Sequence, residues 1–248
     1  MRLEWGPTGG AAVAAGADVA VVVDVLSFTT TLGIAVARGT RVLPFAWKDE
    51  RTAEYAAEHG AVLAVGRHEA RVLENPPPSL SPAQLLEADP VPRLVLPSPN
   101  GSTICAALGT APGAPALVGA SLRTRAAVAA WLAPQVAAGA TVALVPAGER
   151  WPDGSLRPAL EDLWGAGAVL AALTAHVPDA RLSIEAEHAA AAYALVADPL
   201  PDALDRCASG RELTAVGFAA DVRAAAHLDA DDVVPLLGPD GFAPAPVL

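Results

Sequence analysis

Hydrophobic and polar positions along the chain follow two different periods, one typical of strands and one typical of helices. Residues 19–23 form an uninterrupted run of Val and Ala, which predicts a strand buried on both faces, as in a parallel sheet. Other apolar runs predict strands at residues 3–5, 41–45, 61–65, 93–96, 116–119, 141–145 and 232–236. Helical patterns over residues 32–38, 50–59, 104–108, 121–138 and 158–175 follow most of these runs.

This alternation of strands and helices predicts an α/β fold built on a doubly wound, mostly parallel sheet. After residue 178 the pattern changes, because residues 183–230 are mainly helical with breaks at Pro199, Pro201 and Gly210. We therefore expect a single unit over residues 1–248. Alternatively, a main sheet domain at residues 1–178 carries a mainly helical C-terminal portion, residues 179–248, packed on it.

Residues 67–92 interrupt the alternation. Asn75 and the prolines at 76–78 forbid regular structure, and Ser81-Pro82 can start a short helix that runs through Glu87. An irregular excursion of this length inside an α/β chain is often functional.

Charge and composition narrow the function classes. The formal net charge of −11 argues against nucleic acid and anionic membrane surfaces as partners. An anionic substrate would therefore need a metal ion or a few well-placed arginines. The N-terminus lacks the apolar core of a signal peptide, and no apolar run reaches the roughly 20 residues of a membrane span. We expect a cytoplasmic protein with buried thiols at Cys105 and Cys207; a homodimer is compatible with this composition.

Three predicted strand-to-helix turns carry small polar or acidic residues. In the first turn, Asp24 ends the strand at residues 19–23, and Ser27, Thr29 and Thr30 stand ahead of the next helix. This order places a carboxylate and several hydroxyls beside a helix N-terminus, where anions or metal-bound phosphates bind. The alternative is purely structural: Asp24 caps a turn and the threonines cap the helix.

The second turn contains Ser98, Asn100, Gly101 and Ser102. Its backbone N–H groups can meet an anion, and Gly101 permits a positive φ or a close approach of the backbone to a phosphate. In the structural alternative, Ser102 caps the helix at residues 104–108 and Gly101 only serves the turn.

The third turn contains Gly148, Glu149 and Arg150, and Glu161 and Asp162 then open the following helix. Adjacent helical residues point about 100° apart, so one acid could bind a metal while the other caps the helix or orients a neighbour. Both acids could instead simply stabilise the first helical turn, by about 0.3–1 kcal/mol each.

The joint order of these segments resembles the 2-phosphosulfolactate phosphatase family. The matching segments are residues 22–31, 75–77, 98–102, 147–150, 161–167, 217–222 and 234–235, so the resemblance spans nearly the whole chain. It implies a three-layer α/β/α fold and Mg²⁺-dependent removal of phosphate from 2-phosphosulfolactate, a step in coenzyme M synthesis. Many members have Arg where this chain has Ser27, and often an acid after the glycine that corresponds to Gly66. Here Arg67 follows that glycine and could supply the charge that Ser27 does not.

The chemistry of phosphate esters also points to the acids. A phosphate monoester is a dianion near neutral pH, and Mg²⁺ held by two or three carboxylates can neutralise that charge while keeping several waters. We predict Asp24, Glu161 and Asp162 as metal ligands and Asp24, Glu149 and Asp162 as catalytic residues. The D-x-D signature of haloacid-dehalogenase phosphatases is absent, because Leu26 stands at its second position. We therefore favour Asp24 as a metal ligand over Asp24 as the nucleophile.

The predicted substrate is a small acidic phosphorylated molecule. Its predicted binding residues are Ser27, Thr29, Thr30, Ser98, Asn100, Gly101, Ser102, Gly148, Arg123 and Arg150. Arg123 could hold the substrate's acidic group or could be an ordinary surface arginine. The alternatives are a non-catalytic small-anion-binding module and a phosphatase for a different small acidic phosphoester. Four separated acids favour an enzyme, because an anion binder would only suffer their repulsion.

This interpretation has a geometric consequence. Asp24, Asn100 and Gly148 are expected to lie together at one edge of the sheet, because the turns after parallel strands share that edge. If they lay on opposite edges, the assignment of these residues to one site would be wrong.

Overall fold

Nine strands form one sheet in the described part of the computed structural model, which covers residues 1–46, 51–109 and 113–246. The strand order is β1-β7-β2-β6-β10-β11-β3-β5-β4. The bounds are β1 Arg2–Leu3, β2 Val19–Val23, β3 Arg41–Phe45, β4 Val62–Leu63, β5 Arg93–Pro97, β6 Ala116–Ala120, β7 Val142–Pro146, β10 Pro235–Gly238 and β11 Gly241–Pro244. Two short strands, β8 Glu149–Arg150 and β9 Leu156–Arg157, pair with each other outside this sheet.

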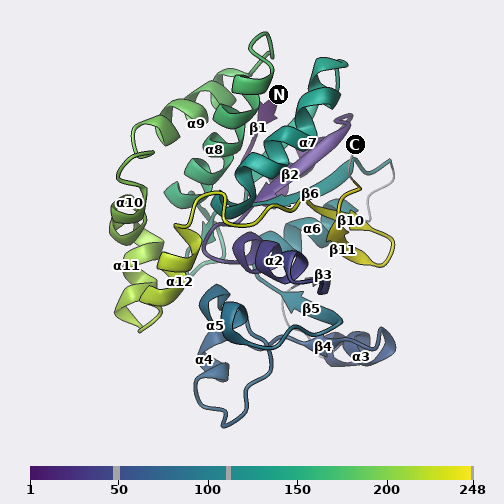
Figure 1. Ribbon diagram of the computed structural model, residues 1–248, viewed down its shortest axis with the longest axis vertical. Helices are drawn as coiled ribbons and strands as arrows, with labels where there is room; N and C mark the ends of the chain where they lie inside the picture. Colours follow the sequence, from purple (N-terminus) through teal and green to yellow (C-terminus); the bar gives the residue numbers. More distant parts are fainter. Residues whose placement is uncertain (47–50, 110–112, 247–248) are drawn as a thin grey trace.

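The sheet consists of two parallel groups joined by an antiparallel hairpin. Strands β1, β7, β2 and β6 run parallel to one another, and so do β3, β5 and β4. The hairpin β10–β11 lies between β6 and β3 and is antiparallel to both (Figure 1). Three antiparallel steps separate the groups, so the two groups run in opposite directions along the sheet.

The predicted α/β class with a mostly parallel sheet is confirmed. The C-terminal end differs from the prediction, which placed one strand at residues 232–236 ahead of an irregular tail. Instead, residues 235–244 form the hairpin, with Pro239 and Asp240 as its two-residue loop. The second strand contains a glycine and a proline among four residues, so its composition gives no strand signal.

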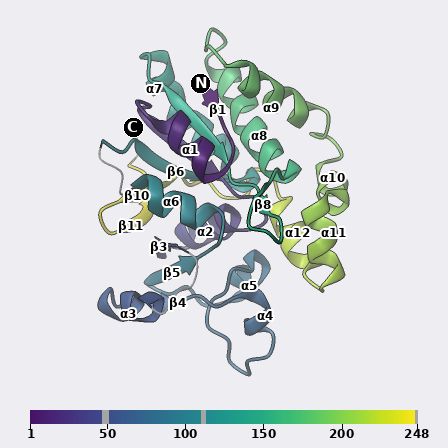
Figure 2. The same ribbon diagram turned by 180° about the vertical axis from the view of Figure 1, so that it is seen from behind.

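Helices cover both faces of the sheet. On β2, the side chains of Val19, Val21 and Val23 join one core cluster with α7 and α8, while those of Ala20 and Val22 join another with α1, α2 and α6. This alternation is the period-2 geometry of a strand buried on both faces. Helices α7 and α8 lie in front of the sheet in Figure 1, and α1 and α6 lie in front of it in Figure 2.

The remaining helices surround these layers. Helix α9 packs along α8, and α12 contacts α5 at the lower end of the molecule in Figure 1. The bounds are α1 Gly6–Ala14, α2 Phe28–Ala37, α3 Arg51–Glu58, α4 Arg67–Ala70, α5 Pro82–Glu87, α6 Gly101–Gly109, α7 Arg125–Ala137, α8 Leu160–His176, α9 Ile184–Ala194, α10 Leu200–Arg206, α11 Ala208–Ala215 and α12 Ala219–Ala225. Within the described residues, none of the helices combines the length and the apolar character needed to cross a bilayer.

Several helices begin at other residues than the sequence predicted. Helix α1 was not predicted, because its residues are mostly glycine and alanine. Helix α2 begins at Phe28 and α6 begins at Gly101, so the threonines and Ser102 lie inside the first helical turns rather than ahead of them. The predicted helix at 121–138 opens with a 3₁₀ turn at Leu122–Thr124. Glu50, the expected start of the helix at 50–59, lies outside the described residues.

The hairpin makes the C-terminus essential to the core. Phe242 on β11 is fully buried, so Phe242→Ala is expected to lower the free energy of unfolding by about 3–5 kcal/mol. Phe45→Ala, at a half-buried position on the adjacent β3, is the matched control and should cost less. Denaturant unfolding measures both. A loss at Phe242 no larger than at Phe45 would show that the hairpin does not join the two halves of the sheet.

Candidate active site

Asp24 is the buried acid at the end of β2. It is only 4% exposed, and each of its carboxylate oxygens accepts a backbone N–H, Oδ1 from Phe28 at 3.1 Å and Oδ2 from Gly101 at 2.7 Å. Burial raises the pKa of Asp24, and the two backbone hydrogen bonds oppose that rise. The helices that follow β2 and β5 thus hold this carboxylate in one orientation.

Gly101 makes this contact sterically feasible. A Cβ atom at position 101 would lie 2.7 Å from Asp24 Oδ2 and 2.7 Å from Phe28 Cδ1, so a larger residue would displace one of them. The close backbone approach expected at Gly101 is therefore present, but its partner is Asp24 rather than an anion in solution. The positive φ that the sequence also allowed is absent from this glycine.

Asp24, Asn100 and Gly148 lie close together, but not at the shared edge of parallel strands that the sequence led us to expect. Asn100 Nδ2 donates to Glu149 Oε2 at 2.9 Å, which joins the turn after β5 to the turn after β7. The physical reason differs from the one expected, because β5 belongs to the parallel group that runs opposite to β2 and β7. The turns meet because α2 and α6 cover the same face of the sheet and contact each other where they begin.

Asp162 joins the turn after β2 to the turn after β7 through two hydrogen bonds. Its Oδ1 accepts the N–H of Val25 at 2.7 Å, and its Oδ2 accepts the N–H of Gly148 at 2.8 Å. Burial, then the charges of Asp24 and Glu161, raise the pKa of Asp162 well above its usual range. Both oxygens thus hold the backbone ends of β2 and β7 at a fixed separation.

Glu149 is the acid that titrates near neutral pH. Burial, followed by the nearby charge of Asp24, raises its pKa to about 7, and the hydrogen bond from Asn100 opposes the rise. A carboxyl group with this pKa can both accept and release a proton under physiological conditions.

Glu161, at the start of α8, is another buried acid of this cluster. It is 2% exposed, and among the described residues its Oε2 has no hydrogen-bond partner. The thiol of Cys207 lies beside it, and burial followed by the charge of Glu161 raises the pKa of Cys207 to about 12. An unpaired carboxylate oxygen among other buried acids is unfavourable.

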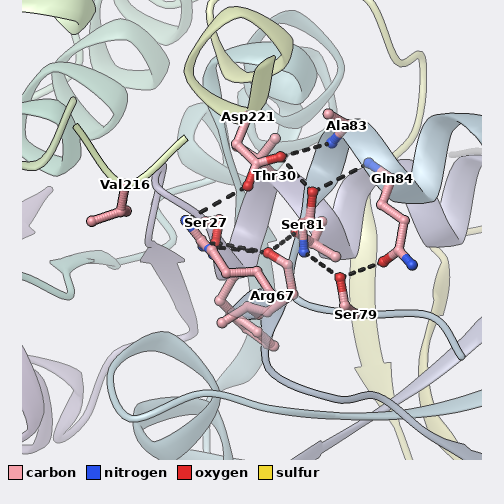
Figure 3. A network of polar contacts seen from close by, with 12 residues as sticks. Ser27, Thr30, Arg67, Ser79, Ser81, Ala83, Gln84, Val216 and Asp221 are labelled. Atoms are coloured by element: carbon pink, nitrogen blue, oxygen red, sulfur yellow. Dashed lines mark hydrogen bonds and ion pairs between the residues drawn. The ribbon is translucent and has the colours of Figure 1, made fainter. Parts of the chain in front are cut away.

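A cavity of about 400 Å³ opens beside Asp24. Ser27, Ser98, Asn100 and Glu149 line it together with Arg67 from α4, the one arginine or lysine among the described residues of its wall. Arg67 Nη2 donates to Ser27 Oγ, so the guanidinium lies where the sequence suggested it could replace a charge missing at position 27 (Figure 3).

Other predicted substrate-binding residues do not point into this cavity. The hydroxyls of Thr29 and Thr30 are fully buried and donate to the carbonyl oxygens of Asp24 and Val25. Ser102 Oγ donates to the carbonyl oxygens of Leu96 and Phe45 and accepts the Phe45 N–H. These three side chains therefore stabilise the turns that carry the acids.

The two predicted arginines have other partners. Arg123 is buried and forms a two-pronged ion pair with Asp231, with Nε at 2.6 Å from one oxygen and Nη2 at 3.0 Å from the other. Arg150 donates to the backbone oxygens of Pro99 and Gly154 at the exposed end of the β8–β9 pair. Asp221 was not singled out as a site residue, although it lies in the matching segment 217–222 and contacts Arg67.

In the described part of the chain, no three His, Cys, Asp or Glu side chains are arranged to hold a metal ion on their own. Mg²⁺, however, usually binds proteins through one or two carboxylates and keeps several waters or phosphate oxygens. The orphaned Oε2 of Glu161 and the raised pKa of Asp24 fit a cation held by this pair of acids.

Comparison with known proteins identifies one family. The model of the 2-phosphosulpholactate phosphatase family matches residues 11–239 of the chain. None of the curated proteins searched matches the chain.

The shifted pKa of Glu149 predicts a pH-dependent stability. Between about pH 4.5 and 7 the folded protein retains a proton on Glu149 that the unfolded chain has lost, so the free energy of unfolding falls as the pH rises. Glu149→Gln removes this contribution. Without divalent cations, the variant is expected to gain on the order of 2 kcal/mol relative to wild type between pH 4 and pH 8.

Thermal or denaturant unfolding at several pH values measures this difference. Glu87→Gln, at an exposed position on α5, is the control and should leave the pH profile unchanged. Parallel profiles for wild type and Glu149→Gln would contradict the burial of a titrating carboxyl at this site.

Proposed function

The chain belongs to the 2-phosphosulpholactate phosphatase family, and we propose that it hydrolyses 2-phosphosulfolactate to sulfolactate and phosphate with Mg²⁺ as its cofactor. The observation that carries this proposal is a cavity lined by the buried Asp24, the half-buried Glu149 and Arg67, with the buried Glu161 close enough to Asp24 and Glu149 for its charge to raise their pKa values. Such a group repels an anionic substrate unless a cation is bound between them.

Asp24 and Glu161 are the residues that would hold Mg²⁺. Asp24 is oriented by two backbone N–H groups, and Glu161 offers an oxygen that no described residue hydrogen-bonds. When bound, the cation neutralises the charge of the phosphoryl group and favours attack at phosphorus. Asp162 acts as a positioning residue, since it joins the ends of β2 and β7 through the N–H groups of Val25 and Gly148 and, unlike Asp24, is not among the residues that line the cavity.

Glu149 is the proposed proton carrier. As the oxygen of a water molecule forms a bond to phosphorus, the Glu149 carboxylate accepts a proton from that water. The bond between phosphorus and the ester oxygen breaks, and the leaving oxygen takes up the proton, so the products are an alcohol and hydrogen phosphate. Glu149 lines the cavity, where its carboxylate can accept and return this proton, and the amide of Asn100 keeps the carboxylate in place.

Asp24→Asn tests the metal site. The change removes a charge and turns the amide NH₂ toward one of the two backbone N–H groups that Asp24 accepts, so phosphate release per folded molecule is expected to fall by about a thousandfold, with some loss of stability. The measurement is phosphate release from a panel of phosphomonoesters that includes 2-phosphosulfolactate, with Mg²⁺ and with EDTA. Asp89→Asn, at an exposed position, is the control. If Asp24→Asn keeps the wild-type rate and Mg²⁺ dependence, Asp24 is not part of the site. If the wild-type protein binds the esters without hydrolysing them, the alternative of a non-catalytic anion-binding module is favoured.

Gly101→Ala tests the geometry around Asp24. The added Cβ overlaps Asp24 Oδ2 and Phe28, so activity per folded molecule is expected to fall by about 10- to 100-fold. Gly238→Ala is the matched control, because the nearest atom to its added Cβ is 3.8 Å away. Wild-type kinetics in correctly folded Gly101→Ala would show that the position of Asp24 does not limit the reaction.

A further inference from the structure

Residues 149–157, which we call the strap, carry Glu149 on the strand pair β8–β9 outside the main sheet. The strap follows Gly148, whose φ is 70°, and it turns back at Gly154, whose φ is 82°. Two strands of two residues each form a pair that is marginally stable by itself. The position of Glu149 therefore depends on contacts that the strap makes with the rest of the molecule.

Arg157 makes one such contact. It stands directly opposite Glu149 in the register of β8 and β9. Its guanidinium forms a two-pronged ion pair with Glu212 on α11, in which Nη1 donates to Oε1 and Nη2 donates to Oε2, each at 2.8 Å. Such a fork of charge-assisted hydrogen bonds fixes direction as well as distance. The guanidinium carbon also lies 5.5 Å from the centre of the Trp151 ring, so the strap itself packs against the cation.

This ion pair ties the strap to the helical C-terminal portion, which it approaches in Figure 2. Within the described residues, no other hydrogen bond joins the strap to α11. At the base of the strap, Gly148 is fixed separately, because its N–H donates to Asp162 at 2.8 Å. Glu149 is thus held along the chain through Gly148 and across the strand pair through Arg157.

The charges support the same arrangement. The hydrogen bonds between Arg157 and Glu212 lower the pKa of the carboxyl and raise the pKa of the guanidinium. Glu212 lines the cavity beside Asp24, where a free carboxylate would repel a phosphate dianion. The pair therefore neutralises an acid of the cavity wall and places a cation opposite Glu149.

Exposure limits what this pair contributes to the fold. The Glu212 side chain is 59% exposed and the Arg157 side chain is 16% exposed. Ion pairs with an exposed member add little to global stability, because water and salt screen them. The consequence of the pair is therefore local: it determines where the strap lies.

From this geometry we infer that Arg157 and Glu212 are positioning residues for proton transfer, because their ion pair holds the strap against α11 and keeps Glu149 at the cavity. The inference rests on the proposed function, which assigns the proton transfer to Glu149. When the pair is broken, the strap moves away from α11, and Glu149 spends less time within reach of the water that attacks phosphorus. The rate of the chemical step then falls more than the binding of the ester.

A double-mutant cycle tests the pair as a unit. Arg157→Gln, Glu212→Gln and the double variant are each expected to lower kcat for phosphate release from 2-phosphosulfolactate by about tenfold. The three losses are expected to agree within about twofold, because each variant breaks the same contact. In Glu212→Gln and in the double variant, KM should change by less than about threefold. Arg157→Lys keeps the charge but not the fork, so it should recover part of the rate.

Trypsin reports the position of the strap without any substrate. Arg150 is exposed on the strap, and cleavage after it gives fragments 1–150 and 151–248, which mass spectrometry identifies. This cleavage requires the strap to open locally, so its rate follows the population of the open form. Arg157→Gln and Glu212→Gln are each expected to speed it by about tenfold. Arg157 precedes Pro158, a bond that resists trypsin, so its replacement removes no competing cut.

Arg206→Gln is the matched control. It breaks another exposed ion pair, between Arg206 and Asp202 on α10, whose oxygen and nitrogen lie 3.0 Å apart. It should change neither kcat nor the cut after Arg150. If Arg157→Gln does not fold, Glu212→Gln, at the more exposed position, decides the question through the same two measurements.

Wild-type kcat in both single variants, or losses that multiply in the double variant, would overturn the inference. A loss of kcat without faster cleavage would also overturn it, because Arg157 would then act through its charge alone. If wild type hydrolyses no phosphomonoester, the proposed function fails, and the trypsin assay tests the ion pair by itself. Faster cleavage of the variants then supports its hold on the strap, and unchanged cleavage overturns it.

Discussion

The burial of the Asp24 carboxylate is the constraint on which the site depends. A carboxylate removed from water must accept hydrogen bonds, and here its donors are the backbone N–H groups of Phe28 and Gly101. These donors begin two helices that follow strands of opposite direction. The hydrogen bonds therefore do more than satisfy one side chain, because they fix how the two halves of the sheet meet at the cavity.

The same burial creates an electrostatic imbalance. Asp24, Glu149 and Asp162 all have raised pKa values, with burial as the first cause in each case and a neighbouring acid as another. Glu161 adds a buried oxygen that has no hydrogen-bond partner in the described part of the chain. Folded proteins tolerate such clusters where a bound cation or substrate completes them, so the strain in the isolated protein and its proposed chemistry have a common origin.

The C-terminal third of the chain contributes to both the core and the site. Its hairpin, β10–β11, fills the sheet between the two parallel groups, and Phe242 is buried in the core on one face. Its helices supply Asp221, which orients Arg67, and Cys207, which lies beside Glu161. A substitution far along the chain from Asp24 can therefore change how the cavity binds a substrate.

The sequence by itself determined the features that depend on local pattern. The apolar run at residues 19–23 predicted a doubly buried strand, and the alternation of periods predicted the α/β class, because each reflects the geometry of a single element. The positions of the acids relative to strand ends also indicated the candidate cluster of Asp24, Glu149, Glu161 and Asp162. None of these features requires knowledge of which segments are neighbours in space.

Tertiary structure alone decided which polar groups meet. The sequence could not show that the N–H of Gly101 binds Asp24, that Arg123 pairs with Asp231, or that Arg67 lies against Ser27. Each of these contacts joins residues at least 40 positions apart. The local pattern of hydrophobic and polar residues carries no information about contacts over such distances. The hairpin at residues 235–244 was missed for the same reason: it is a strand pair because β6 and β3 flank it, not because its own four-residue strands favour that conformation.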